Sequence, residues 1–370
     1  MNIPEPKLQH LIEKLANSHV SFAIYRLPWT DEPIMILQET GETETFTDLQ
    51  SLNGKTGFVL SPFRYAESHP IVLIRPDKTA RGWNEIEDAL AGIDETSLDE
   101  CTTQAVSPKA ETDGEQAYAE AFERFIAPLR EGKFKKLVLS RSETLALADN
   151  FSPLTAFINA CNSYPRMMIS LSHTPVTGTW IGSTPEIILS GQDNLWHTVS
   201  LAGTMPMKGE DMPEDWSDKN REEQAFVSDY LRKTIKQFGS KISEKGPYTA
   251  RAGQLVHLKT DFHFCLKKTD NFGDILNKLH PTPAVCGLPK EEAYTFIPEN
   301  EGYDRSYYSG IIGWLEPQGH TTLYINLRCM HITGSYATLY AGGGILPSSE
   351  VTTEWEETKQ KMDTMKRIIS

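Results

Sequence analysis

The chain has 370 residues, of which 39% are hydrophobic and 23% are charged, which is ordinary for a globular protein with a large core. This length allows two domains or one large domain. The formal net charge of −14 argues against a surface for nucleic acid or an anionic membrane. The five cysteines are scattered, and neither a signal-peptide core nor a membrane-spanning run is evident, so we expect a cytoplasmic protein.

The first part of the chain predicts a helix over residues 4–17, followed by short strands between Pro, Gly and acidic turns. These strands are predicted over Val20–Tyr25, Ile34–Leu37, Gly57–Leu60 and Ile71–Ile74. A polar stretch over residues 94–114 predicts a linker or exposed loop. We therefore expect a strand-rich N-terminal portion with its linker over residues 1–113, which packs on a core formed by residues 114–370.

Two ionisable residues stand at the ends of apolar strands in the second part. Lys136 opens the run KLVLSR, and Glu186 follows Pro185 just before another apolar run. A lysine amine that is partly withdrawn from water can serve as a general base near neutral pH. A carboxyl group held partly dry has a raised pKa and can donate a proton. The other interpretation is that both residues are solvated strand ends.

The stretch Tyr340–Lys361 places three glycines before an acidic helix. Glycines allow a ligand to approach the backbone closely. Glu354, Glu357 and Lys361 are spaced at i, i+3 and i+7, so they share one face of the helix, which Thr353 is placed to cap. The two carboxylates can hold a hard cation such as Mg²⁺, although an exposed acidic helix after a turn would give the same pattern.

The order of these motifs resembles the chorismate-binding enzymes, which include isochorismate synthases, salicylate synthases and the large subunits of anthranilate and aminodeoxychorismate synthases. Tyr340–Lys361 resembles the glycine-rich strand and Glu, Glu, Lys helix of the family. The strand that begins at Lys136 resembles its Lys-Val-Val-Leu-Ser-Arg strand, and GSTPE, ending at Glu186, resembles its Gly-x-Ser-Pro-Glu motif with Thr184 in place of Ser. The resemblance covers about residues 114–370.

Further motifs resemble the substrate- and metal-binding positions of the family. The run LAGT ends at Thr204, VHL surrounds His257, and Lys219 and Glu223 match an acidic helix motif in which Asn220 replaces a common acid. The resemblance implies substrate contacts for Gly203, Thr204, His257, Ala284, Tyr308, Arg328, Gly342, Gly344 and Lys361. It implies that Mg²⁺ is held by Glu223, Glu357 and, through bound water, Glu354.

The resemblance implies an α+β fold of large, mostly antiparallel sheets packed with outer helices, with the site in a cleft between two halves. It also implies Mg²⁺-dependent conversion of chorismate to isochorismate. Lys136 would activate the water that attacks C2, and Glu186 would protonate the departing C4 hydroxyl. We expect a monomer that acts on this small molecule without nucleic acid, membrane or glutaminase subunit.

Three alternatives remain open at this point. The loop HPTPAVCGLP is typical of isochorismate synthases, and amine-transferring and pyruvate-eliminating relatives usually carry Thr where this chain has Ala284. Ala284 therefore argues against a salicylate synthase and against an anthranilate- or aminodeoxychorismate-type synthase. Lys136 and Glu186 argue against an inactive chorismate-binding protein. Menaquinone, siderophore and salicylate biosynthesis all use isochorismate, so the pathway stays undetermined.

Overall fold

The structure is a computed structural model that describes residues 1, 4–93, 98, 114–207, 209, 211–268 and 271–369. The described residues form two nine-stranded sheets, and the strand pairs within them are antiparallel. The first sheet runs in the order β14 (Gly287–Leu288), β7 (Lys136–Ala146), β18 (Tyr336–Ile345), β17 (Cys329–Thr333), β9 (Gly178–Thr184), β8 (Met168–Thr174), β1 (Ser21–Arg26), β2 (Ile34–Gln38) and β6 (Lys78–Arg81).

The second sheet has the same number of strands and faces the first. It runs in the order β12 (Gly239–Ala252), β13 (Leu255–Leu266), β11 (Leu195–Pro206), β10 (Ile187–Gln192), β16 (Thr321–Ile325), β15 (Ile311–Leu315), β4 (Gly57–Ser61), β5 (Ile71–Ile74) and β3 (Glu44–Phe46). Buried side chains from both sheets, among them Phe58, Trp180 and Tyr324, form one cluster. The two sheets therefore pack face to face.

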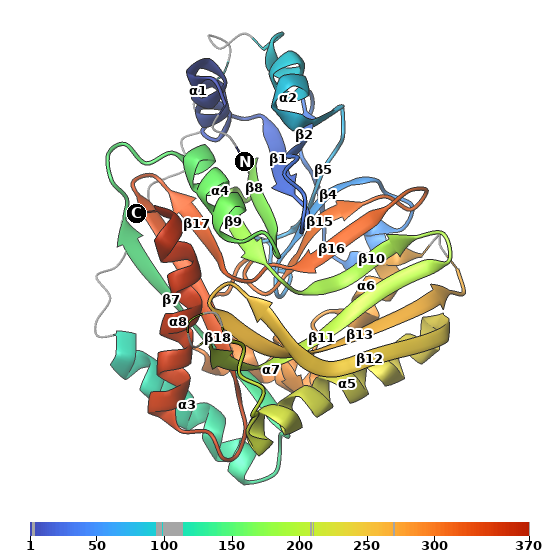
Figure 1. The fold of residues 1–370 in the computed structure, drawn as a ribbon, viewed down its shortest axis with the longest axis vertical. Helices are drawn as coiled ribbons and strands as arrows, with labels where there is room; N and C mark the ends of the chain where they lie inside the picture. The colour runs from blue at the N-terminus through green and yellow to red at the C-terminus, as the bar shows by residue number, and fades with distance from the viewer. Residues whose placement is uncertain are drawn as a thin grey trace.

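Helices cover the outer faces of this pair of sheets (Figure 1). The described helices are α1 (Pro6–Leu15), α2 (Gly82–Leu90), α3 (Gly114–Arg130), α4 (Pro153–Ser163), α5 (Asp218–Phe238), α6 (Phe272–Leu279), α7 (Lys290–Asn300) and α8 (Val351–Ile369), with a 3₁₀ turn at Leu49–Leu52. Helices α1, α2, α4 and α8 share a core with the first sheet, and α5 and α6 share one with the second. Within the described residues, every helix is too short or too polar to cross a membrane.

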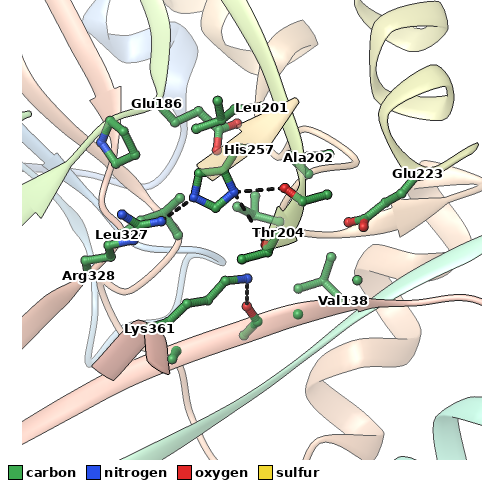
Figure 2. Close-up of a pocket in the computed structure, with 18 of the residues that line it drawn as sticks. Val138, Glu186, Leu201, Ala202, Thr204, Glu223, His257, Leu327, Arg328 and Lys361 are labelled. Carbon is green, nitrogen blue, oxygen red and sulfur yellow. Dashed lines mark hydrogen bonds between the residues drawn. The ribbon is translucent and has the colours of Figure 1, made fainter. Parts of the chain in front are cut away.

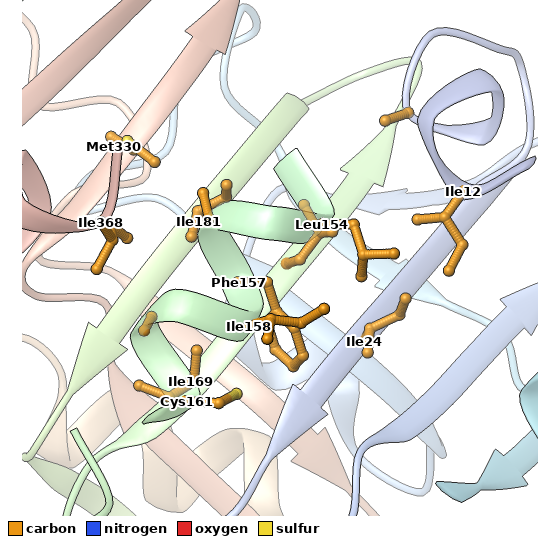
Figure 3. Close-up of a cluster of buried hydrophobic side chains, with 14 of the residues drawn as sticks. Ile12, Ile24, Leu154, Phe157, Ile158, Cys161, Ile169, Ile181, Met330 and Ile368 are labelled. Atoms are coloured by element: carbon orange, nitrogen blue, oxygen red, sulfur yellow. The ribbon is translucent and has the colours of Figure 1, made fainter. Parts of the chain in front are cut away.

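The core beneath α1 and α4 shows how the apolar pattern produces the packing (Figure 3). Ile12 of α1 and Phe157 of α4 are completely buried, and they lie in one cluster with Ile24 and Ile181 of the first sheet. Apolar residues at helical spacing face the sheet, whose strands present alternate side chains to it. The predicted α+β fold of antiparallel sheets with outer helices is confirmed.

The N-terminal strands are shared between the two sheets. Strands β1, β2 and β6 continue the first sheet beyond β8, and β3, β4 and β5 continue the second beyond β15. The linker predicted over residues 94–114 lies almost entirely outside the described residues, as does the segment just before the boundary predicted at residue 114. The chain before that segment thus completes both sheets of the fold.

Two local predictions were wrong. The apolar residues of Leu323–Met330 predict one strand, but β16 ends at Ile325 in the second sheet and β17 begins at Cys329 in the first. Thr353 does not cap α8, because that helix begins at Val351 and the amide of Glu354 already donates to the Glu350 carbonyl. Apolar composition therefore indicated the strands, but it gave no sign of the crossing between sheets.

Candidate active site

One pocket between the two sheets gathers most of the predicted site residues. Figure 2 shows Glu186 and Glu223 at opposite ends of the view, with His257 between them and Lys361 below. Eleven of the fourteen predicted residues line this central pocket: Glu186, Gly203, Thr204, Glu223, His257, Ala284, Tyr308, Arg328, Gly342, Gly344 and Lys361. The other three, Lys136, Glu354 and Glu357, contact its walls from behind.

Glu186 lies where the chain passes from β9 of the first sheet to β10 of the second. Its side chain is 2% exposed, and one carboxyl oxygen has no hydrogen-bond partner among the described residues. Burial raises the pKa of Glu186 to about 8, although the positive charges of Lys136, Lys361 and Arg328 oppose this shift. Glu186 is therefore a carboxylic acid that keeps its proton at neutral pH and can donate it.

Lys136 is fully buried at the start of β7, and its Nζ lies 3.0 Å from Oε1 of Glu223. Burial works to raise the pKa of Glu223, but the charges of Lys136 and Lys219 outweigh it, so this pKa is lowered. Glu223 lines the central pocket, as Glu186 does, and Lys136 contacts the pocket through Glu223. A buried acid thus lines the pocket, and a buried amine lies next to one of the other lining residues.

The three glycines of β18 make room for these groups. A Cβ at Gly344 would come within 2.1 Å of Glu223 Oε1, and one at Gly342 would lie 3.0 Å from the Tyr308 hydroxyl. A Cβ at Gly343 would lie 3.3 Å from one carboxyl oxygen each of Glu354 and Glu357. Side chains at Gly343 and Gly344 would therefore displace the carboxylates that face the strand, and one at Gly342 would crowd the Tyr308 hydroxyl.

The acidic face of α8 approaches the same strand, as its spacing predicted. Nζ of Lys361 donates to the Gly342 carbonyl and to Glu357 Oε1, both at 2.7 Å. Glu354 is 1% exposed, pairs with Lys219, and has a second oxygen without a hydrogen-bond partner in the described structure. Burial and the nearby charge of Glu357 raise the pKa of Glu354. Two carboxylates that repel each other at a glycine strand are a suitable environment for a cation.

Arg328 and His257 form the wall beside Glu186 (Figure 2). His257 Nδ1 donates to the Gly203 carbonyl at 2.9 Å, and Nε2 accepts from the Arg328 guanidinium. Burial and the charge of Arg328 lower the pKa of His257 well below its usual range, so the imidazole is neutral. Burial also lowers the pKa of Arg328, to about 10, which leaves it charged at neutral pH. A charged arginine oriented by a neutral histidine is suited to bind a carboxylate.

Ala284 and Tyr308 complete the lining from a loop and a turn. Ala284 is half-buried at the pocket, next to Val285. Tyr308 is buried and stacks on Tyr340, with ring centroids 5.5 Å apart at an interplanar angle of 11°. His263, which has the same strand parity as His257, instead stacks on His197 and does not line the pocket.

A buried ion pair that was not predicted from the sequence supports the site. The guanidinium of Arg305 donates to both carboxyl oxygens of Glu301, at 2.6 and 2.7 Å, and both residues are at most 5% exposed. Arg305 also donates to the carbonyls of Val138 and Val285, and Glu301 accepts from the amide and hydroxyl of Ser140. This network joins β7 to the loop that carries Ala284. The pattern Glu-x-x-x-Arg before a strand was its only sequence signal.

The acidic residues of the site have the oxygen ligands that a hard cation prefers. Among the described residues, however, no three His, Cys, Asp or Glu side chains are close enough together to hold a metal ion as they stand. Glu354 has an unpartnered buried oxygen, Glu357 faces the same glycine, and Glu223 stands at the next glycine. Each of these carboxylates is paired with a lysine: Lys219, Lys361 and Lys136 respectively. Oxygen ligands are those that Mg²⁺ prefers, and the lysine partners show that positive charge is favoured here.

The fold and the residues of the central pocket define a class of proteins that the sequence comparison identifies. The sequence model of the family described as Chorismate binding enzyme matches residues 71–370. The chain therefore belongs to the chorismate-binding enzymes.

Within that family the chain is similar to isochorismate synthases. It is 28% identical over 207 residues to isochorismate synthase EntC of Escherichia coli (strain K12), and this match covers 53% of each of the two proteins. It is 28% identical over 281 residues to the salicylate biosynthesis isochorismate synthase of Pseudomonas aeruginosa, covering 71% of this chain and 58% of that protein. The matched region thus spans little more than half the length of these relatives.

Solved structures with this fold include more than one kind of enzyme. The menaquinone-specific isochorismate synthase MenF of Escherichia coli superposes with a TM-score of 0.76 at 21% identity, covering 100% of this chain and 94% of that one. Anthranilate synthase component I of Streptococcus pneumoniae superposes with a TM-score of 0.65 at 17% identity, covering 94% and 91%. The fold alone therefore does not separate these activities.

Proposed function

We propose that this protein is an Mg²⁺-dependent isochorismate synthase, which converts chorismate to isochorismate. The observation that carries the proposal is one pocket that is lined by a buried, protonated carboxyl group, Glu186, and that has a buried amine, Lys136, ion-paired with its lining residue Glu223. Displacement of a hydroxyl by water across a ring needs a base at one position and an acid at another. The named relatives EntC and MenF support the same reaction.

The substrate's two carboxylates would be bound by the cations of the pocket. Arg328 lines the pocket beside Glu186, and Lys361 lines it next to Gly342 of β18. We assign the pyruvyl carboxylate to Arg328 and His257, and the ring carboxylate to Lys361, Thr204 and the glycine backbone of β18. These local cations offset the negative charge of the chain as a whole.

In the proposed reaction, a water oxygen forms a bond to C2 of the ring while Lys136 accepts the proton that this water loses. The two conjugated ring double bonds shift, from C1=C2 to C1=C6 and from C5=C6 to C4=C5, the C4–oxygen bond breaks, and Glu186 gives its proton to the leaving hydroxyl, which departs as water. The Nζ of Lys136 lies 3.0 Å from Glu223 Oε1, so the amine is held next to a residue that lines the pocket. The buried pocket keeps both groups away from bulk water.

Glu223 and Glu357 would hold Mg²⁺, with Glu354 supporting it through bound water. When bound, the ion would offset the charge of the ring carboxylate and polarise the adjacent double bonds. The assignment of these residues to Mg²⁺ is supported by the carboxylates of Glu354 and Glu357, which face Gly343, and that of Glu223, which faces Gly344.

The proposal is tested by incubating the purified protein with chorismate, with and without Mg²⁺, and separating the products by chromatography. Isochorismate formed only with Mg²⁺ is the expected result. Salicylate with pyruvate would instead indicate a salicylate synthase, and a product formed only with ammonia would indicate an amine-transferring enzyme. Unchanged chorismate under all of these conditions would indicate an inactive binding protein.

A further inference from the structure

A lysine outside the set of predicted site residues bridges the two halves of the molecule at this site. Lys219 lies in the first turn of α5, which packs on the second sheet, and its Nζ pairs with Oε1 of Glu354 on α8, which packs on the first. On the basis of the proposed Mg²⁺ site, we infer that Lys219 is a displaceable internal counter-ion that competes with Mg²⁺ for Glu354.

The surroundings of Glu354 explain why it needs a counter-ion. The carboxylate is 1% exposed and lies beside Glu357 at Gly343. A buried charge next to a like charge is costly unless a positive group is close by. Lys219 supplies that charge to one oxygen, while the second oxygen has no hydrogen-bond partner within the described chain. The second oxygen therefore remains available to another cation.

Lys219 differs from the other two lysines in being able to leave. Its side chain is 24% exposed, so the amine can turn into solvent, whereas the Lys136 side chain is 0% exposed. Lys361 is held by two hydrogen bonds, one of them to a backbone carbonyl. A compact ammonium on a flexible stem exchanges readily with water. Of the three cations, Lys219 is the one that Mg²⁺ can replace at the smallest structural cost.

If Lys219 and Mg²⁺ compete for Glu354, removing the Lys219 amine should lower the stability of the Mg²⁺-free protein and raise its affinity for Mg²⁺. Without Mg²⁺, a neutral residue at position 219 leaves Glu354 as an uncompensated buried charge, so the protein should be less stable. With Mg²⁺, the site is more negative and has lost its competitor, so the ion should bind more tightly. A lysine that instead helped to hold the metal shell would weaken Mg²⁺ binding when removed.

The experiment is isothermal titration of the full-length protein with MgCl₂, together with thermal unfolding with and without Mg²⁺. Lys219→Met should bind Mg²⁺ about fivefold more tightly than the wild type, unfold at a lower temperature without Mg²⁺, and gain more from its addition. Lys219→Arg keeps the charge and can pair with both carboxyl oxygens, so its Mg²⁺ affinity should equal that of the wild type or be lower. Only the variant that removes the positive charge is therefore expected to raise the Mg²⁺ affinity.

Lys359→Met is the matched control. Lys359 lies on α8, the helix that carries Glu354, and it pairs there with Glu356 on the exposed face, where both side chains are about half exposed. Its Mg²⁺ affinity should stay within about twofold of the wild type. The inference is overturned if Lys219→Met binds Mg²⁺ as tightly as the wild type or more weakly. If the Met variant does not fold, the Arg variant decides, and tighter Mg²⁺ binding by Lys219→Arg overturns the inference. An absence of Mg²⁺ binding in the wild type also overturns it, even if chorismate is converted. The proposed function fails separately, if chorismate is not converted.

Discussion

Glu186 and Arg328 lie on two neighbouring segments by which the chain crosses from one sheet to the other. The Glu186 carbonyl accepts from the amide of Ile325 at 2.9 Å, and the Arg328 carbonyl accepts from the amide of Ser183 at 3.0 Å. Arg328 adopts a φ of 46°, in the left-handed region that non-glycine residues rarely occupy. Backbone hydrogen bonds between the crossings therefore fix the acid and the arginine on the same wall of the central pocket.

The assignment of base and acid predicts that Lys136→Ala and Glu186→Gln each lose nearly all turnover. Removing a general acid or base typically costs about 10²–10⁴-fold in rate. Chorismate consumption with saturating Mg²⁺ measures the effect, and circular dichroism checks that the fold is intact. Lys135→Ala is the control for the first variant, because Lys135 is the adjacent lysine and is exposed. A near wild-type rate in either site variant would remove that residue from its role.

The raised pKa of Glu186 predicts a pH-dependent stability effect that is independent of activity. Between its ordinary pKa of 4.5 and its folded value of about 8, the native protein binds more protons at this group than the unfolded chain. This carboxyl group therefore destabilises the protein increasingly as the pH rises through that window. Glu186→Gln cannot ionise, so its free energy of unfolding should exceed that of the wild type by on the order of a few kcal/mol above pH 8.

Urea unfolding of wild type and Glu186→Gln at pH 5 and at pH 9 measures this difference. The two proteins should be nearly equal in stability at the lower pH and clearly different at the higher one. The same stability difference at both pH values would mean that Glu186 titrates as an ordinary exposed carboxyl group.

Much of this site was accessible from the sequence, because its residues belong to motifs whose order resembles one family. Helical spacing placed Glu354, Glu357 and Lys361 on one face, and the structure shows that Lys361 donates a hydrogen bond to Glu357. Apolar runs indicated β1, β2, β4 and β5 within one or two residues of their bounds. Local patterns of this kind depend on neighbours in the chain, so a single sequence contains them.

Features that depend on distant partners had no comparable signal in the sequence. The crossing at Arg328 was hidden because apolar residues continue across it, from Leu323 to Met330. The pairing of Arg305 with Glu301 has a helical spacing that is common on exposed helices, so burial could not be inferred from it. Which carboxylate pairs with which lysine also depends on how α5 and α8 meet across the two sheets.

The metal assignment predicts that Glu357→Gln needs more Mg²⁺ than the wild type. The neutral amide is a weaker ligand for a hard cation, and Lys361 loses its ionic partner. The Mg²⁺ concentration at half-maximal rate should rise by about tenfold or more, since metal affinity depends strongly on ligand charge. Glu356→Gln changes the adjacent, exposed carboxylate and should leave the titration unaltered. An unchanged Mg²⁺ titration for Glu357→Gln would exclude this residue from the metal shell.

The network of Arg305 and Glu301 predicts a coupling that a double-mutant cycle can measure. Arg305→Met leaves Glu301 as an unpaired buried charge and should lower the free energy of unfolding by about 3–5 kcal/mol. Adding Glu301→Gln removes that charge, so the double variant should regain part of the stability. Arg124→Met removes an exposed arginine that contacts the Asn300 carbonyl and should cost under about 1 kcal/mol.

Ser140→Ala removes one hydroxyl from the same network and leaves its ion pair in place. Since Ser140 lies on β7, the strand that carries Lys136, this variant also tests whether the network affects the site. The hydroxyl of Ser140 contacts Glu301 at 2.7 Å and the Tyr303 hydroxyl at 2.6 Å, and Gly342 is its pairing partner on β18. Its loss should cost about 1–2 kcal/mol of stability, because Glu301 keeps its bonds to Arg305 and to the Ser140 amide. Because β7 also carries Lys136, we expect kcat to fall several-fold while KM changes little. If stability falls but kcat does not, the network supports the fold and does not position the base.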